Sequence, residues 1–155
     1  MSNFTFPVEI LWPGGKRVIA SVAGKPSVEI ATPPEFKGNY PDQWSPEDFL
    51  VAAAASCYAV TLIAIAGRSE IPLRALSINA EGAVGREDKE PFGFKTIDLH
   101  VVAATDPGHE DDLCRAAVQA EESCLVSAAL RIPVRLSFVV DATADLATSI
   151  EGDSR

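Results

Sequence analysis

Residues 45–66, with the sequence SPEDFLVAAAASCYAVTLIAIA, predict one long helix. Ser45 is a hydroxyl N-cap, Pro46 suits the first helical position, and the two carboxylates that follow complement the positive end of the helix dipole. Gly67 indicates the end of the helix, and Arg68 beside it suits the negative end of the dipole. The other segments are therefore interpreted around this helix.

The apolar part of this helix raises the question of whether it spans a membrane. Phe49 to Ala66 contains eighteen residues without a charge, at the lower limit of transmembrane length. Seven of them are alanine, and Ser56, Tyr58 and Thr61 interrupt the middle, so transfer into lipid would be weakly favourable. We interpret the segment as the central helix of a protein core, and we expect no membrane partner.

Alternating apolar residues with Gly and Pro punctuation predict strands on both sides of the helix. They lie at 8–11, 17–22 and 28–31 before it, followed by a proline-containing loop at 32–44, and at 73–84, 92–104 and 132–140 after it. A short charged link joins 73–84 to 92–104, which predicts that these two strands pair in antiparallel fashion.

A second helix is predicted at roughly 110–130 because small and apolar residues recur on one narrow face. These residues are Leu113, Ala117, Ala120, Cys124 and Ser127. Cys124 is therefore expected to point inward, whereas Cys114 lies off this face. The element order, without alternating βα units, predicts an α+β fold with antiparallel sheets packed around the long helix. Because these elements cannot cover every side of the long helix, we expect a homodimer.

Length and composition restrict the class of protein. The 155 residues suit a single α+β domain at 1–140 followed by an acidic tail at 141–155. With 47% hydrophobic residues the chain can bury a sizeable core, which excludes the disordered class. The net charge is −9 and the basic residues do not cluster, so nucleic acid is not expected as a partner.

The cysteines indicate a reducing compartment. Cys57, Cys114 and Cys124 are scattered and odd in number, unlike the disulfide framework of a small secreted protein. Residues 1–10 lack the basic and apolar regions of an export signal. We therefore expect a cytoplasmic protein.

The thiols are the strongest candidates for reactive groups. His100 and His109 have no cysteine or acid at metal-ligand spacing, so neither a metal nor another cofactor is expected. The glycine motifs of nucleotide-binding loops and of serine hydrolases are absent. Cys57 and Cys124 each lie among small residues, which would let two helices approach as closely as a disulfide requires. Both are also compatible with a packing role, since a buried cysteine often behaves as a small apolar residue.

The segments around these two cysteines resemble a known family. Ser45-Pro46-Glu47-Asp48-Phe49-Leu50 followed by Ser56-Cys57, and then Ala120-Glu121-Glu122-Ser123-Cys124-Leu125-Val126-Ser127, are similar to motifs of the OsmC/Ohr family of osmotically inducible and organic hydroperoxide resistance proteins. The resemblance implies an intertwined α+β homodimer with thiol sites at the subunit interface. It also implies a peroxidase that reduces organic hydroperoxides and is recycled by a dithiol such as dihydrolipoamide or a lipoylated protein.

The resemblance also implies roles for individual residues. Cys57 would be the peroxidatic thiol, Cys124 the resolving thiol, and Glu47 the carboxylate that holds a catalytic arginine. The family places this arginine after a Gly-Gly pair, where this chain has Lys16, followed by Arg17. Arg17 is the predicted cation, although strand alternation turns it to the face opposite Lys16 unless a bulge intervenes.

Chemistry explains the need for these residue types. A thiol in an apolar helix is mostly protonated at neutral pH, and a guanidinium within about 4–6 Å favours the thiolate. A carboxylate fixes such a guanidinium through paired hydrogen bonds. Attack on the peroxide bond would give an alcohol and a sulfenic acid on Cys57, which would condense with Cys124 to a disulfide.

Helix geometry restricts how Glu47 could take part. Ten residues of α-helix span about 15 Å, so Glu47 cannot lie beside Cys57 of its own straight helix. We expect Glu47 to come from the partner chain, with a helix break or a long bridging arginine as alternatives.

The substrate and the activity itself leave alternatives open. Aromatic residues near the loop would either line a pocket for a fatty or aryl hydroperoxide or pack in the core or the dimer; they are Phe36, Tyr40, Trp44, Phe49 and Tyr58. Instead of a peroxidase, the chain could be a stress-related ligand-binding protein without catalytic activity on the same dimeric scaffold. A thiol–disulfide oxidoreductase acting on proteins is the third hypothesis.

Overall fold

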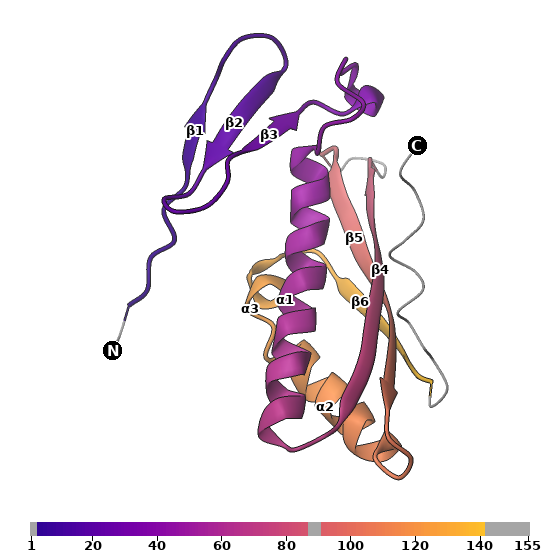
Figure 1. Cartoon of the computed structure of the whole chain (residues 1–155). Coiled ribbons are helices and arrows are strands. Elements are labelled where there is room, and N and C mark those ends of the chain that lie inside the picture. The colour runs from indigo at the N-terminus through magenta and orange to yellow at the C-terminus, as the bar shows by residue number, and fades with distance from the viewer. Residues whose placement is uncertain (1–2, 87–90, 142–155) are drawn as a thin grey trace. The chain divides into compact units, whose positions relative to one another are not determined.

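The computed structural model of the chain describes residues 3–86 and 91–141 (Figure 1). Of the predicted tail at 141–155, only Asp141 lies within the described residues. The chain forms two compact units, residues 1–50 and 51–155, and each is described by itself. The predicted boundary of a single domain at residue 140 stays a prediction.

The first unit is built on a three-stranded antiparallel sheet in the order β1-β2-β3. Its elements are β1 (Glu9–Leu11), β2 (Arg17–Ser21), β3 (Val28–Ala31) and the short 3-10 helix η1 (Pro34–Phe36). All three strands lie where the sequence predicted them. Gly14 and Gly15 have φ values of 108° and 67° in the β1–β2 turn, a conformation that glycine adopts without strain.

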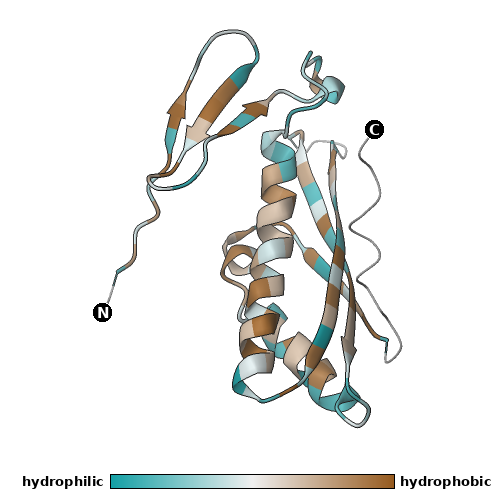
Figure 2. Cartoon of the chain, viewed as in Figure 1, coloured by the Kyte–Doolittle hydropathy of each residue, from teal (hydrophilic) through white to brown (hydrophobic). Residues whose placement is uncertain are grey.

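One face of this sheet is uniformly apolar. The strand register places Ile10, Val18, Ala20, Val28 and Ile30 on it, because directly paired residues point to the same side of a sheet. Ile10 keeps 54% of its surface exposed, and every residue of β1 is exposed. Figure 2 shows hydrophobic residues along these strands. Apolar side chains therefore gather on one face of this sheet, and part of that face is exposed, as is typical of a surface that another protein covers.

The long helix α1 (Pro46–Arg68) is continuous over 23 residues. At its start the Asp48 N–H donates to Ser45 Oγ at 3.1 Å, and the Ser45 N–H donates to Asp48 Oδ2 at 2.8 Å. This reciprocal capping confirms the predicted start. The helix extends past the predicted end at Gly67, because the left-handed residue after it is Glu70, with φ of 55°.

α1 is long and apolar enough to cross a membrane, judged by length and composition alone. Core helices of soluble proteins meet the same criterion. One side of α1 is buried within the chain, at Ala54, Tyr58, Leu62, Ile65 and Ala66. Another side remains open, and Val60 is 61% exposed. The chain itself therefore covers α1 on one side only.

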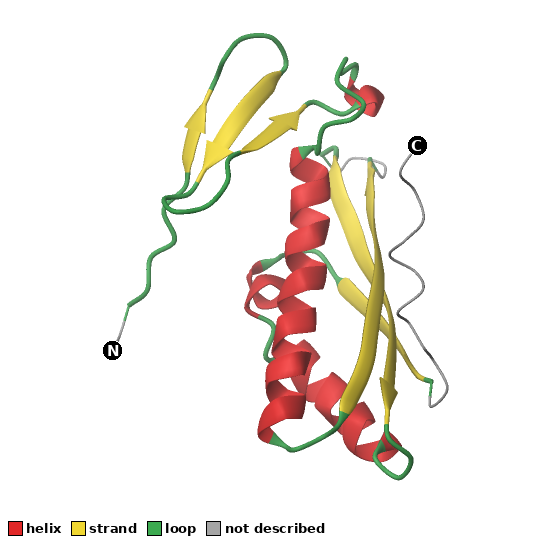
Figure 3. Ribbon diagram, in the orientation of Figure 1, coloured by secondary structure: helices red, strands yellow, loops and turns green. Residues whose placement is uncertain are grey.

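The second unit holds a mixed three-stranded sheet in the order β4-β5-β6, along which α1 lies (Figure 3). Its strands are β4 (Leu73–Gly85), β5 (Gly93–Thr105) and β6 (Val134–Val140). β4 and β5 pair in antiparallel fashion, as predicted. β6 pairs with β5 in parallel, which departs from the expected antiparallel arrangement because the chain crosses over through two helices before it returns.

The second predicted helix is interrupted. The expectation of one helix at 110–130 was wrong, since α2 (Glu110–Glu122) and α3 (Leu125–Ala129) are separate helices. Between them Cys124 has an extended backbone, with φ of −72° and ψ of 109°. α2 packs against β6 and buries the predicted inward residues Leu113, Ala117 and Ala120. Cys124 is also buried, as predicted, although it lies in the break rather than within a helix.

Candidate functional site

Cys57 lies midway along α1 and is half-buried. The next residue, Tyr58, is fully buried, and its hydroxyl donates to the carbonyl of Ala117 in α2 at 3.3 Å. Burial, and then the negative charge of Glu121, raise the pKa of Tyr58, so its hydroxyl remains protonated and available as a donor. This hydrogen bond fixes α1 against α2 one residue away from Cys57.

Cys124 is the buried member of the thiol pair, with 1% of its surface exposed. The Ser127 hydroxyl donates to its sulfur at 3.2 Å, and Cys57 lies close enough to lower the pKa of Cys124. Both thiols are free. The fold thus brings together two cysteines that are 67 positions apart in the sequence (124 − 57).

Opposing effects act on the pKa of Cys124. Burial raises it, whereas hydrogen bonds from Ser127 and Cys57 lower it, and the backbone N–H groups of Ser127 and Val126 add to the lowering. The hydrogen bonds together outweigh burial, so the pKa is below that of an ordinary cysteine. Neither backbone N–H has the geometry of a capping hydrogen bond to the sulfur. The Ser127 hydroxyl is therefore the best-aligned donor to this thiol.

Arg17, the predicted catalytic cation, lies in the first unit. Its Nη1 is 3.3 Å from Glu29 Oε2, and its guanidinium carbon is 5.4 Å from the centre of the Tyr40 ring. Tyr40 itself approaches the backbone at Gly15, where an added Cβ would lie 3.1 Å from the tyrosine hydroxyl oxygen. Glu29 and Tyr40 therefore hold Arg17 on β2.

Glu47 lies in the first turn of α1, in the same unit as Arg17. Within residues 3–86 and 91–141 the structure records no ion pair between the two, and the catalytic roles predicted for both stay predictions. Arg17 Nε and Glu47 Oε2 are each buried without a hydrogen-bond partner among the described residues. Buried polar atoms normally have a partner, so these two atoms are notable.

The continuity of α1 decides one of the alternatives for Glu47. The helix has no break between Glu47 and Cys57. A partner-chain Glu47 and a long bridging arginine remain as the ways to join this carboxylate to the thiol.

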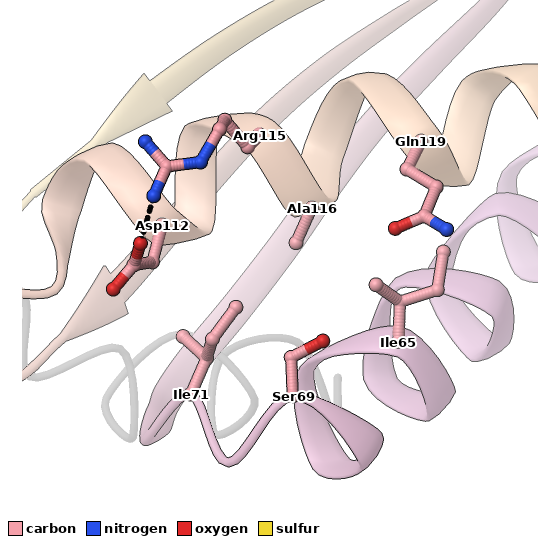
Figure 4. A pocket seen from close by; sticks show the side chains of 7 residues that line it. All are labelled: Ile65, Ser69, Ile71, Asp112, Arg115, Ala116 and Gln119. Atoms are coloured by element: carbon pink, nitrogen blue, oxygen red, sulfur yellow. Dashed lines mark hydrogen bonds and ion pairs between the residues drawn. The ribbon is translucent and has the colours of Figure 1, made fainter.

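A cavity of about 380 Å³ lies between the C-terminal part of α1 and α2, and Figure 4 shows the side chains that line it. Its lining residues are Ile65, Ser69, Ile71, Asp112, Arg115, Ala116 and Gln119. Arg115 and Asp112 form an ion pair at this cavity. Neither Cys57 nor Cys124 lines it, so the cavity is separate from the thiol site.

The structure also bears on the other candidate groups. No cluster of three or more metal-ligating side chains occurs among the described residues. Tyr58 is a core residue, whereas Trp44 is exposed and packs on Phe49 with ring centroids 5.3 Å apart. Cys114 is exposed and lies outside the thiol pair.

Comparison with known proteins decides the family. The family model of the OsmC-like proteins matches residues 38–138. The chain belongs to the OsmC-like family. The uncharacterized protein YmaD of Bacillus subtilis is 31% identical to this OsmC-like chain over 147 residues, which is 89% of the chain and 94% of the relative. The predicted resemblance is therefore confirmed.

Solved structures confirm the predicted OsmC-like α+β fold. An OsmC-like protein of unknown function from Vibrio cholerae has a TM-score of 0.77 at 16% identity, over 90% of this chain and all of that one, 100%. An organic hydroperoxide resistance protein from Elizabethkingia anophelis has a TM-score of 0.70 at 18% identity, over 90% of this chain and 97% of that one. The organic hydroperoxide resistance protein OhrB of Bacillus subtilis has a TM-score of 0.61 at 22% identity, over 89% of this chain and 98% of that one.

Sequence reasoning missed the partners of the predicted site residues. Ser127 was placed on an inward helix face without a role, although its position three residues after Cys124 was a readable signal for a hydrogen bond. Glu29 and Tyr40 were not linked to Arg17, because their contacts depend on the sheet register and the loop path.

Proposed function

We propose that this OsmC-like protein is a thiol-dependent peroxidase that reduces organic hydroperoxides to alcohols. The observation that carries the proposal is a pair of free thiols, Cys57 and Cys124, that lie close enough for Cys57 to lower the pKa of Cys124. Cys57 is the more exposed of the two, so it is the thiol that meets the peroxide. A peroxide-related role also agrees with the names of structural neighbours that are organic hydroperoxide resistance proteins.

The proposed reaction uses two neighbouring thiols. The Cys57 thiolate attacks one peroxide oxygen, a sulfur–oxygen bond forms, and the oxygen–oxygen bond breaks to release the alcohol. Cys124 then attacks the sulfenic sulfur of Cys57, which gives a disulfide and releases water. A small external dithiol returns two electrons and restores both thiols by exchange. Dihydrolipoamide or a lipoylated protein supplies this dithiol in our proposal, and the cytoplasm is the compartment that keeps it reduced.

The active assembly in this proposal is a homodimer in which Glu47 of one chain serves the site of the other. The exposed apolar face of β1–β3 and the open side of α1 at Val60 support an additional covering surface.

The test is consumption of cumene hydroperoxide or tert-butyl hydroperoxide in the presence of dihydrolipoamide. We expect Cys57→Ser to abolish turnover and Cys114→Ser, a matched control at an exposed thiol, to retain it. Peroxide alone should convert the wild-type protein to a species that has lost two hydrogens and contains the Cys57–Cys124 disulfide.

The alternatives predict other outcomes of this test. If peroxide leaves both thiols reduced, the ligand-binding function on the same scaffold replaces the peroxidase. If disulfides exchange rapidly while peroxide is not consumed, the protein is instead a thiol–disulfide oxidoreductase.

A further inference from the structure

Cys57 and Cys124 differ in exposure and in hydrogen bonding, and this difference gives the reductive half-reaction a direction. We propose that the dithiol attacks the sulfur of Cys57, that Cys124 departs as the thiolate, and that Ser127 is the positioning residue that stabilises this leaving group. The inference rests on the proposed function, because it concerns reduction of the disulfide formed there.

Access selects the sulfur that is attacked. Disulfide exchange requires the incoming thiolate to reach one of the two sulfur atoms. Cys57 is half-buried and follows the exposed Ser56, whereas Cys124 is 1% exposed. The incoming thiolate therefore reaches Cys57, and Cys124 becomes the leaving group.

Hydrogen bonding prepares Cys124 to leave. A thiol with a lower pKa departs faster in exchange reactions. The Ser127 hydroxyl points its donor at the Cys124 sulfur over 3.2 Å. The Ala128 N–H donates to the Cys124 carbonyl at 3.0 Å, which closes the turn that holds Ser127 beside the sulfur. The donor is thus in place before negative charge develops on the sulfur.

The step balances as an exchange with a dithiol. A thiolate of the dithiol bonds to the Cys57 sulfur, the disulfide bond breaks, and its electron pair moves to the Cys124 sulfur. The second thiol of the reductant then attacks the reductant's first sulfur, which is bonded to Cys57 in the mixed disulfide. This step closes a cyclic disulfide in the reductant and releases the Cys57 thiolate. The two protons lost by the dithiol restore the two protein thiols, so the dithiol is oxidised and the protein is reduced by two electrons.

The first experiment measures the rate of this step without using peroxide. The disulfide is prepared in the full-length protein with diamide, and its reduction by dihydrolipoamide is followed under pseudo-first-order conditions. Loss of one hydrogen bond to the departing sulfur should slow Ser127→Ala about three- to tenfold, whereas Ser127→Thr should retain the wild-type rate. Ser123→Ala is the matched control, because Ser123 is an exposed serine directly before Cys124. Equal rates in wild type and Ser127→Ala would overturn the proposal.

The second experiment identifies the attacked sulfur in the wild-type protein, so it does not depend on a variant that folds. The diamide-made disulfide is exposed briefly to 2-mercaptoethanol, released thiols are alkylated, and the peptides are mapped by mass. We expect the monothiol on Cys57 and the alkyl group on Cys124. The opposite distribution overturns the proposal.

A third measurement separates positioning from a merely structural effect. In a Cys57→Ser background, the pH dependence of Cys124 alkylation should move to higher pH when Ser127 becomes Ala and should stay in place for Ser123→Ala. An unmoved profile overturns the role of Ser127.

The two proposals can fail separately. Failure of peroxide to form the disulfide removes the peroxidase, but the exchange experiments on the diamide-made disulfide still decide the direction of reduction.

Discussion

The Tyr58 hydroxyl joins the helix that carries Cys57 to the helix that precedes Cys124. Its hydrogen bond to the Ala117 carbonyl is buried, so its removal is not replaced by water. We expect Tyr58→Phe to lower the free energy of unfolding by about 1 kcal/mol, as for loss of one buried hydrogen bond. Urea denaturation at neutral pH measures this change, and an unchanged midpoint would contradict the role assigned to the hydroxyl.

The same residue predicts a pH dependence. The pKa of Tyr58 is raised in the folded state above its ordinary value of 10.0, by burial first and by Glu121 second. The stabilisation is fully present below the unfolded pKa and is lost as pH rises above it, because the unfolded state releases the proton more readily. Wild type should therefore lose more stability than Tyr58→Phe between about pH 8 and about pH 11. Parallel urea titrations at the two pH values compare the slopes.

Individual residues differed in how well the sequence predicted them. The burial of Cys124 followed from periodicity, whereas its predicted role as the partner of Cys57 stays a prediction. The contacts of Arg17 with Glu29 and Tyr40 could not be predicted, because they depend on a diagonal neighbour across two strands and on the path of a loop.

At the scale of elements, the capping box fixes where α1 begins. Ser45 accepts from the Asp48 N–H, and Ala at this position would leave that donor without its partner. We expect Ser45→Ala to destabilise the protein by about 1 kcal/mol, the usual cost of losing an N-cap. Thermal or urea unfolding measures the change, and Ser56→Ala, an exposed serine on the same helix, should stay within about 0.5 kcal/mol of wild type.

The close packing of α1 on β4 depends on Gly82. A Cβ at Gly82 would lie 2.6 Å from Val51 Cγ2 and 2.7 Å from Phe94 Cε1. Gly82→Ala should therefore destabilise the protein by about 1–3 kcal/mol through overpacking. Gly85→Ala, on the same strand but with no atom of the described residues within 4 Å of the added Cβ, is the control for strand propensity. Equal unfolding midpoints for the two variants would show that this contact relaxes freely.

The strands followed from alternation and punctuation, which are local properties, and the structure has them where they were predicted. The break at Cys124 was missed because the helical spacing of apolar residues continues through it, whereas the helical backbone conformation is interrupted there. The parallel pairing of β6 was missed because it depends on a crossover that joins distant parts of the chain.

At the scale of the whole molecule, the apolar face of β1–β3 offers a way to test the proposed homodimer. Ile10→Lys places a charge on this face and should yield a monomer by size-exclusion chromatography. Because the proposed homodimer places Glu47 of one chain at the thiol site of the other, peroxidase turnover should fall to background in the monomer while the thiols remain titratable.

The matched control for this experiment is Glu9→Lys, which lies next to Ile10 on the opposite face of the strand. It should keep both the oligomeric state and the turnover. A monomeric Ile10→Lys protein with full activity would refute the shared site.

The break between α2 and α3 also bears on how much secondary structure would change during the proposed cycle of oxidation and reduction. Because Cys124 lies between α2 and α3 rather than inside either helix, closing the proposed disulfide with Cys57 should not require either helix to unwind. Oxidised and reduced protein should therefore give superimposable far-ultraviolet circular dichroism spectra. Under the proposed peroxidase cycle, the helices would then stay intact while the two thiols alternate between reduced and oxidised states.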